Sequence, residues 1–193
     1  MARARQADAE ARDAIALLLD RHLAPAPLMR RVSMFILTRS LARSGRSTAA
    51  AIAEDVHLPY NSLASRIQRA GGDRILALRD EMILTRLAYC FRDPLLAWQM
   101  VADLLEVRTH RALLRVVRRA RSTSPQLWRS RVTPEGEIRL FTSFLMRNAE
   151  PWAQVSVDRG LCCPHCGGAV YGHPGSGPAS AILPSTDAQG GGR

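Results

Sequence analysis

Residues 97–131 constrain the fold more than any other stretch, because two amphipathic helices and a turn follow one another there. The first predicted helix has a short apolar face, formed by Val101, Ala102, Leu104 and Leu105. Its periodic pattern stops at residues 106–108. A second helix is predicted from Thr109, with an apolar inner side formed by Leu113, Val116 and Val117.

The other side of this second helix is basic, and it carries His110, Arg111, Arg115, Arg118 and Arg119. A short helix, a tight turn and a second helix with a basic outer face form the layout of a helix-turn-helix DNA reader. An ordinary solvated basic face is the alternative interpretation. The turn and the inner apolar face favour the DNA reader.

The charge of the whole chain agrees with a polyanionic partner. The formal net charge is +10 and the sequence pI is about 11.0, which fits nucleic acid or an acidic membrane surface. All 27 basic residues are Arg, whose planar guanidinium can hold a phosphate or a guanine edge through two hydrogen bonds. No apolar run approaches the ~18 residues of a membrane span, and the N-terminus has no secretory pattern. We therefore expect no membrane association and a cytoplasmic location at the bacterial nucleoid.

The rest of the chain predicts an all-α fold with four segments. Residues 1–27 form an N-terminal helix and a Pro-containing linker, and residues 28–131 form the main domain. Within that domain Asp73 is expected to cap a long connecting helix, and Asp93-Pro94 to begin the helix that enters residues 97–131. Residues 132–159 are expected to pack on the domain, with 137–146 either a strand or a helix. The Gly- and Pro-rich residues 160–193 are expected to be mostly disordered.

Residues 47–72 predict a second helix-turn-helix unit. Ser47 or Thr48 can cap its first helix, His57-Leu58 forms the turn, and Pro59 suits a first helical position. The second helix of this unit turns polar residues outward, namely Tyr60, Asn61, Ser62, Ser65, Arg66 and Arg69. Asn61 can pair with adenine through two hydrogen bonds, or it can act as a local cap.

Two such units joined by one helix resemble the DNA-binding domain of AraC/XylS-type transcription regulators, over about residues 28–131. Val101-Ala102, Leu113 and the segment from Ser124-Pro125 to Leu127-Trp128-Arg129 fall at positions of that family's pattern. His57 and Glu106 stand where the family usually has Gly, so the chain resembles a divergent member. The resemblance implies about seven helices and two recognition helices that enter successive major-groove segments of DNA.

The base-reading and phosphate-binding roles divide along the second recognition helix. Arg108, Thr109, His110 and Arg111 lie at its start, where side chains reach base edges. We expect Arg111 and Arg115 to contact guanine, and Arg118, Arg119 and Arg121 to contact phosphates. A connecting helix of about 18–20 residues would span roughly 27–30 Å, close to the ~34 Å of one DNA turn.

A cysteine motif near the C-terminus is the main competing signal. Cys163 and Cys166 have the spacing of a zinc knuckle, with Cys162, His165 or His173 as further ligands. Since a second such pair is absent, the alternatives are a zinc site, a thiol–disulfide motif and an incidental tail. Cys90, within a buried stripe, is expected to be a core residue.

The leading hypothesis is therefore a sequence-specific DNA-binding transcriptional regulator without a cofactor. Its partners would be double-stranded DNA and RNA polymerase, and the chain would be a monomer or a weak dimer through the N-terminal helix. The alternative is a phage- or plasmid-associated accessory protein with a helical docking domain and a zinc-binding tail. We expect no enzyme, because no nucleophile–base set, phosphate loop or paired carboxylate motif is present.

Overall fold

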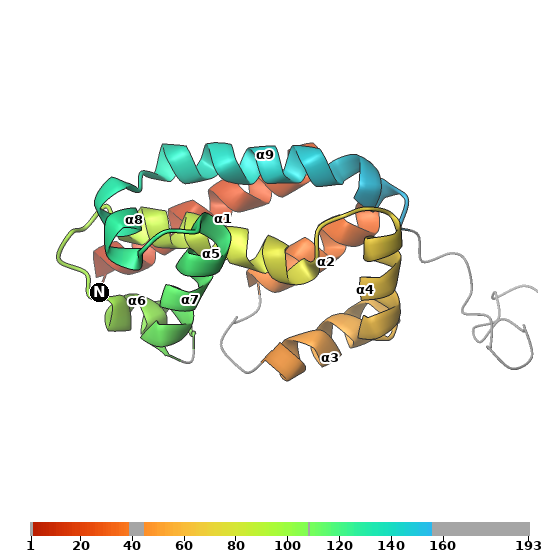
Figure 1. Cartoon of the computed structure of the whole chain (residues 1–193), viewed down its shortest axis with the longest axis horizontal. Helices are drawn as coiled ribbons and strands as arrows, with labels where there is room; N and C mark the ends of the chain where they lie inside the picture. Colours follow the sequence, from red (N-terminus) through yellow and green to blue (C-terminus); the bar gives the residue numbers. More distant parts are fainter. Residues whose placement is uncertain (1, 39–44, 108, 156–193) are drawn as a thin grey trace, which may run out of the picture. The chain divides into compact units, whose positions relative to one another are not determined.

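The computed structural model describes residues 2–38, 45–107 and 109–155, and every regular element within them is an α-helix (Figure 1). This confirms the all-α prediction. The helices are α1 (Ala2–His22), α2 (Pro27–Thr38), α3 (Gly45–Val56), α4 (Tyr60–Arg69), α5 (Ile75–Cys90), α6 (Trp98–Leu104), α7 (His110–Arg121), α8 (Pro125–Arg131) and α9 (Pro134–Ala153). All of them belong to one compact unit.

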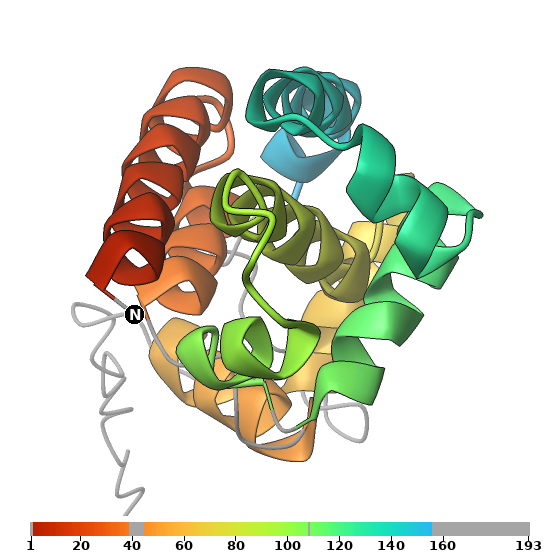
Figure 2. The same cartoon turned by 90° about the vertical axis from the view of Figure 1, so that its left-hand side faces the viewer.

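Helix α5 is the centre of this unit, and every residue from Met82 to Ala88 is buried. A helix that is buried on all sides needs neighbours all round it. Helices α1, α2, α7 and α9 supply them, as the view of Figure 2 shows. The long connecting helix predicted from the sequence is thus also the core.

Helices α1 and α9 cover one side of α5 (Figure 1). The buried stripe of α1 recurs at helical spacing and consists of Ala4, Asp8, Ala11, Ile15 and Leu19. The stripe can include the charged Asp8 because its carboxylate forms an ion pair with Arg86 of α5 at 2.6 Å. For residues 137–146 the structure decides in favour of helix, within α9. Thr133 caps α9 by accepting a hydrogen bond from the Gly136 amide at 3.1 Å.

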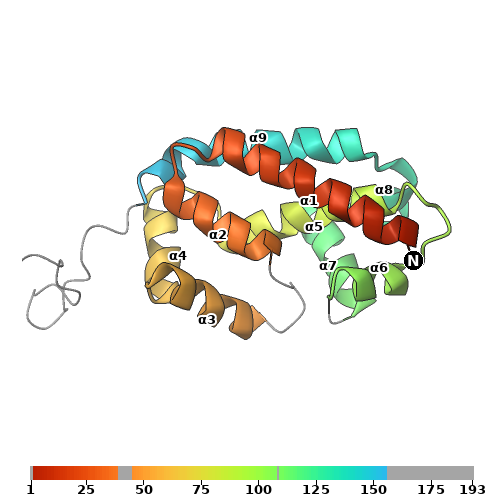
Figure 3. The ribbon, with the colours of Figure 1, turned by 180° about the vertical axis from the view of Figure 1, so that it is seen from behind.

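Two helix pairs lie on the side of α5 that faces away from α9, one at each end (Figures 1 and 3). The α3–α4 pair packs on α2, where Arg31 forms an ion pair with Asp55 at 2.9 Å. The α6–α7 pair packs on α5 and on α8. Both pairs have apolar inner faces, and the second helix of each pair packs on the first, while α7 also packs on α5.

The turns of the two pairs have the same backbone geometry. His57 and Glu106 both have φ of 53°, in the left-handed region. The amide after each donates back to an alanine carbonyl, Leu58 to Ala53 at 3.1 Å and Val107 to Ala102 at 2.8 Å. This is the Schellman ending of a helix, which favours Gly at the left-handed position. At both positions the regulators that the sequence resembles usually have Gly.

Three local predictions need correction. Asp73 does not cap α5. It forms two hydrogen bonds with Asn148 of α9 instead: its backbone amide donates to Asn148 Oδ1 at 2.6 Å, and its carboxylate accepts from Asn148 Nδ2 at 2.9 Å. Asp93-Pro94 does not begin a helix, because α6 starts only at Trp98. The Asp93 carboxylate instead accepts a hydrogen bond from the Leu95 amide within a turn. The connecting helix has 16 residues, so it spans about 24 Å.

Candidate nucleic-acid interface

The exposed face of α7 carries a row of arginines without internal partners. Arg111, Arg115 and Arg118 are exposed, and none makes a hydrogen bond or ion pair with another described residue. Their spacing of four and then three residues puts them on one face of the helix. We call these three residues the arginine row. Long cationic side chains that no described residue pairs with can bind an external anion without first breaking an ion pair among those residues.

The start of α7 is fixed by short-range contacts. Thr109 is the N-cap, and its hydroxyl accepts from the Ala112 amide at 3.3 Å. His110 Nδ1 lies 3.0 Å from Gln99 Oε1 of α6. Gln99 was not predicted from the sequence, since nothing local marks a contact between two helices. Arg108 lies outside the described residues. The capping and the His110 contact orient the first turn of α7, where base-reading side chains are expected.

The structure separates the remaining two arginines of α7 from the row. Arg119 pairs with Asp80 of α5 at 2.5 Å, and its side chain is 48% exposed. Arg121 is only 13% exposed and is held by Glu81 of α5 and Glu137 of α9. The prediction that Arg121 binds phosphate is therefore wrong, because its guanidinium is already committed to two carboxylates. Arg119 keeps part of its surface towards solvent.

Burial and charge pairing set the protonation of these groups. Burial raises the pKa of Asp80 above its usual range, and the hydrogen bond and charge of Arg119 only partly oppose it. One oxygen of Asp80, Oδ1, has no hydrogen-bond partner. Burial disfavours the charged form of Arg121, but the hydrogen bonds to Glu81 and Glu137 outweigh this and raise its pKa. Arg121 is thus a permanent cation inside the protein.

Helix α4 presents a more polar and less basic face than α7. Asn61, Ser65 and Arg69 are exposed at intervals of four residues, so they share one face. Pro59 is the N-cap of α4, and no side chain caps the helix, so Asn61 does not act as the cap. Tyr60, Ser62 and Arg66 are partly exposed beside this face. Hence the predicted base-reading residues of α4 do lie on the surface.

The first turns of α4 and α7 point to the same side of the unit. Both helices begin near α3 and α6, and both run towards α5, as Figures 1 and 3 show. The first turns of the two helices therefore lie on one side of the unit, opposite α9. A single elongated partner could reach both helix ends.

Among the residues that the structure describes, no group of three His, Cys, Asp or Glu side chains lies close enough to hold a metal ion. Cys162, Cys163, His165, Cys166 and His173 lie outside the described residues. Cys90 is buried, as predicted. None of the described helices combines the length and the apolar character needed to cross a membrane.

Comparisons with protein-family models, with curated proteins and with solved structures find no match for this chain. Its function is therefore inferred from the geometry of its own residues.

Proposed function

We propose that the chain is a sequence-specific DNA-binding transcriptional regulator that places α4 and α7 in successive major-groove segments. The arginine row carries this proposal. Arg111, Arg115 and Arg118 are exposed on one face of α7 and unpaired among the described residues, while Arg119 and Arg121 of that helix pair with carboxylates of α5 and α9. A surface that keeps several cations free on one helix face suits a polyanion.

Three further features support the proposal. Each helix pair has a tight turn of the same geometry, and the second helix of each pair starts on the same side of α5. The exposed groups differ between the helices, with guanidinium groups on α7 and amide and hydroxyl groups on α4. The roles follow from this difference: Arg111 and Arg115 bind guanine edges, Arg118 binds phosphate, and Asn61 binds adenine.

Selection of binding sites from random duplex DNA tests the proposal on the purified full chain. The expected product is a sequence with two conserved segments, which footprinting places on one face of the duplex about one helical turn apart. Arg115→Ala should weaken binding to the selected site by about 1–3 kcal/mol and relax the base preference at one position. Arg118→Ala should weaken binding to all sequences alike and reduce its salt dependence.

Arg147→Ala is the matched control, because Arg147 is exposed on α9, on the opposite side of α5, and pairs with no residue that the structure describes. This variant loses the same charge and should keep full affinity. The proposal is refuted if selection yields no preferred sequence, or if Arg115→Ala and Arg147→Ala bind the selected site equally well.

A further inference from the structure

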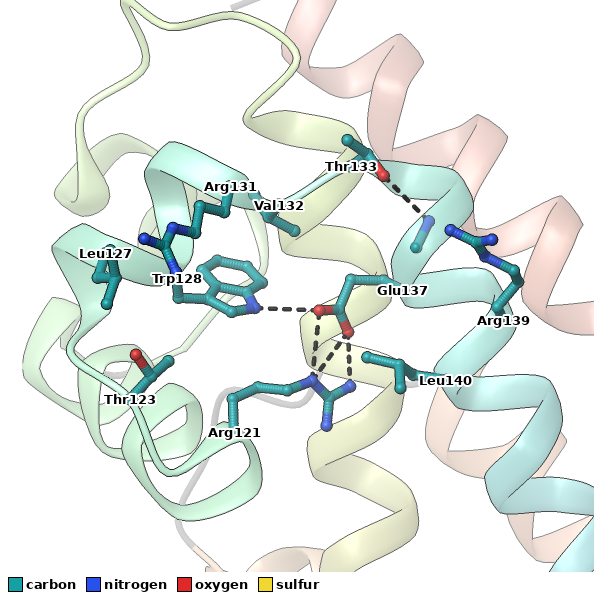
Figure 4. A pocket seen from close by; sticks show the side chains of 11 residues that line it. Arg121, Thr123, Leu127, Trp128, Arg131, Val132, Thr133, Glu137, Arg139 and Leu140 are labelled. Carbon is teal, nitrogen blue, oxygen red and sulfur yellow. Dashed lines mark hydrogen bonds and ion pairs between the residues drawn. The ribbon is translucent and has the colours of Figure 1, made fainter.

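A hollow of about 580 Å³ lies between the end of α7, α8 and the first turns of α9. Figure 4 shows the side chains that line it. A volume of this size falls within the range of small-molecule sites, roughly 300–1,000 Å³. The DNA-contacting residues proposed above do not line the hollow, so it needs a separate explanation.

The floor of the hollow is polar and fully bonded. Glu137 is buried; it accepts a hydrogen bond from Trp128 Nε1 at 3.0 Å and is paired with Arg121. Glu81 holds the other side of Arg121. Arg121 and the indole therefore hold the Glu137 carboxylate in place through an ion pair and a hydrogen bond. A bonded and buried floor of this kind keeps its geometry when a ligand binds.

The rim of the hollow is cationic. Arg131 of α8 and Arg139 of α9 flank it, and neither makes an ion pair or a side-chain hydrogen bond with a described residue. Three arginines and one glutamate line the hollow in total. Arg121 is shared between Glu137 and Glu81, so the cations available to an anionic ligand are the two rim arginines, Arg131 and Arg139.

Apolar groups stand beside these cations. Leu127 and Leu140 are 41% and 48% exposed, and both line the hollow together with the Trp128 indole. Leucine side chains left open to water next to unpaired guanidinium groups suit a ligand with two parts. One part would be a carboxylate or a similar anionic group, and the other a compact apolar body that removes the leucines from water.

We propose that this hollow is a binding site for a small organic anion with an apolar body. The anionic group binds Arg131 or Arg139 or both, and the apolar body packs on Leu127, Leu140 and Trp128. Binding at this place has a consequence for α7, because Glu137 also holds Arg121, the last residue of that helix. An effect of the ligand on DNA affinity rests on the proposed function; the binding itself does not.

Calorimetric titration of the full chain with 2-naphthoate, in the absence of DNA, tests the site. We expect one molecule to bind per chain with a Kd of about 1 mM or tighter. The neutral 2-naphthamide and the small anion acetate should each bind at least about tenfold more weakly, since each lacks one of the two parts.

The double substitution Arg131→Gln and Arg139→Gln should weaken 2-naphthoate binding by about tenfold or more, and Leu140→Asn should also weaken it. Arg147→Gln is the control on the same helix, outside the hollow, and should bind like the unaltered chain. Because the side chains of Arg131 and Arg139 bond to no described residue, the double variant should fold, which its circular dichroism melting curve checks.

The proposal is overturned if 2-naphthoate does not bind, if the amide binds as well as the acid, or if the double variant matches the Arg147→Gln control. These outcomes are independent of DNA selection. A chain that binds 2-naphthoate but selects no DNA would retain the ligand site and lose the proposed function.

Discussion

Arg119 of α7 and Asp80 of α5 form a 2.5 Å ion pair whose two partners differ sharply in exposure. The Asp80 side chain is 3% exposed, whereas the Arg119 side chain is half exposed. The pair thus joins the proposed DNA-reading helix to the core helix. It leaves Asp80 Oδ1 buried without a hydrogen bond, and this local defect leads to the first prediction.

The pH dependence of stability should report the buried carboxylate of Asp80. Burial raises the pKa of Asp80 above its unfolded value of 3.8, so the folded chain holds this proton more tightly than the unfolded chain. The contribution of Asp80 to the free energy of unfolding therefore falls as pH rises from the unfolded pKa through the higher folded pKa. Asp80→Asn removes that contribution, so its stability relative to the unaltered chain should improve from pH 4 to pH 7. Urea unfolding of both chains at pH 4 and pH 7 measures this change. A relative stability of Asp80→Asn that is lower at pH 7 than at pH 4 contradicts the prediction.

The two left-handed turn residues should be sites of stabilisation. His57 and Glu106 have φ of 53°, where a side chain costs about 1 kcal/mol and Gly does not. We expect His57→Gly and Glu106→Gly each to raise the free energy of unfolding by roughly 0.5–1 kcal/mol. Glu54→Gly, at an exposed helical position of α3, is the control and should lower it by about 1 kcal/mol. Loss of stability in both turn variants would mean that the side chains contribute more than the backbone strain.

The contact between Gly72 and Trp152 should not tolerate a methyl group. A Cβ at Gly72 would lie 2.5 Å from the indole of Trp152, which is fully buried and donates to the Asp73 carbonyl. Gly72→Ala should therefore destabilise the chain by about 1–3 kcal/mol, measured by urea unfolding. In a Trp152→Leu background the same substitution should cost much less. An equal cost in both backgrounds would show that the indole is not the cause.

The pair of Asp8 and Arg86 should be strongly coupled, because both side chains are buried and joined by two hydrogen bonds of 2.6 and 2.9 Å. Asp8→Asn removes the carboxylate from the buried Arg86, and Arg86→Met leaves Asp8 only the partly exposed Arg12 at 3.1 Å, so each should cost about 3–5 kcal/mol. The double variant Asp8→Leu with Arg86→Met should recover most of that loss. As a comparison, Arg30→Met breaks the exposed pair with Asp20 and should cost less than about 1 kcal/mol. Additive losses in the Asp8–Arg86 double variant would contradict the coupling.

Cys90 should be chemically inert in the folded chain. Burial, and secondarily the charge of Asp8, raises its pKa to about 12. With Cys162, Cys163 and Cys166 replaced by Ser, alkylation of Cys90 by iodoacetamide at pH 8 should be at least about 1,000-fold slower in the folded chain than in denaturant. Mass spectrometry follows the modified fraction. Equal rates would show that α1 does not protect this end of α5.

The sequence predicted those elements whose signals are local. The amphipathic pattern of residues 110–121, the helix start at Thr109 and the apolar residues on the inner side of α7 all lie within one or two helical turns of each other. The two turns were also predicted, from the interruption of the apolar pattern. Residues 137–146 were ambiguous, because α9 buries Phe141, Phe144 and Leu145 but leaves Leu140 and Met146 exposed.

The tertiary structure alone decided which arginines are free. All the arginines of α7 share one residue type and one helix, so the sequence suggested a common basic face. Packing brings Asp80 and Glu81 of α5 and Glu137 of α9 against the last turn, and these carboxylates take Arg119 and Arg121. Arg111, Arg115 and Arg118 are exposed and form no ion pair with a described residue, so their charge remains available to a partner. Short-range spacing therefore determined the helix and its two faces, whereas ion pairing between distant segments determined which charges the surface presents.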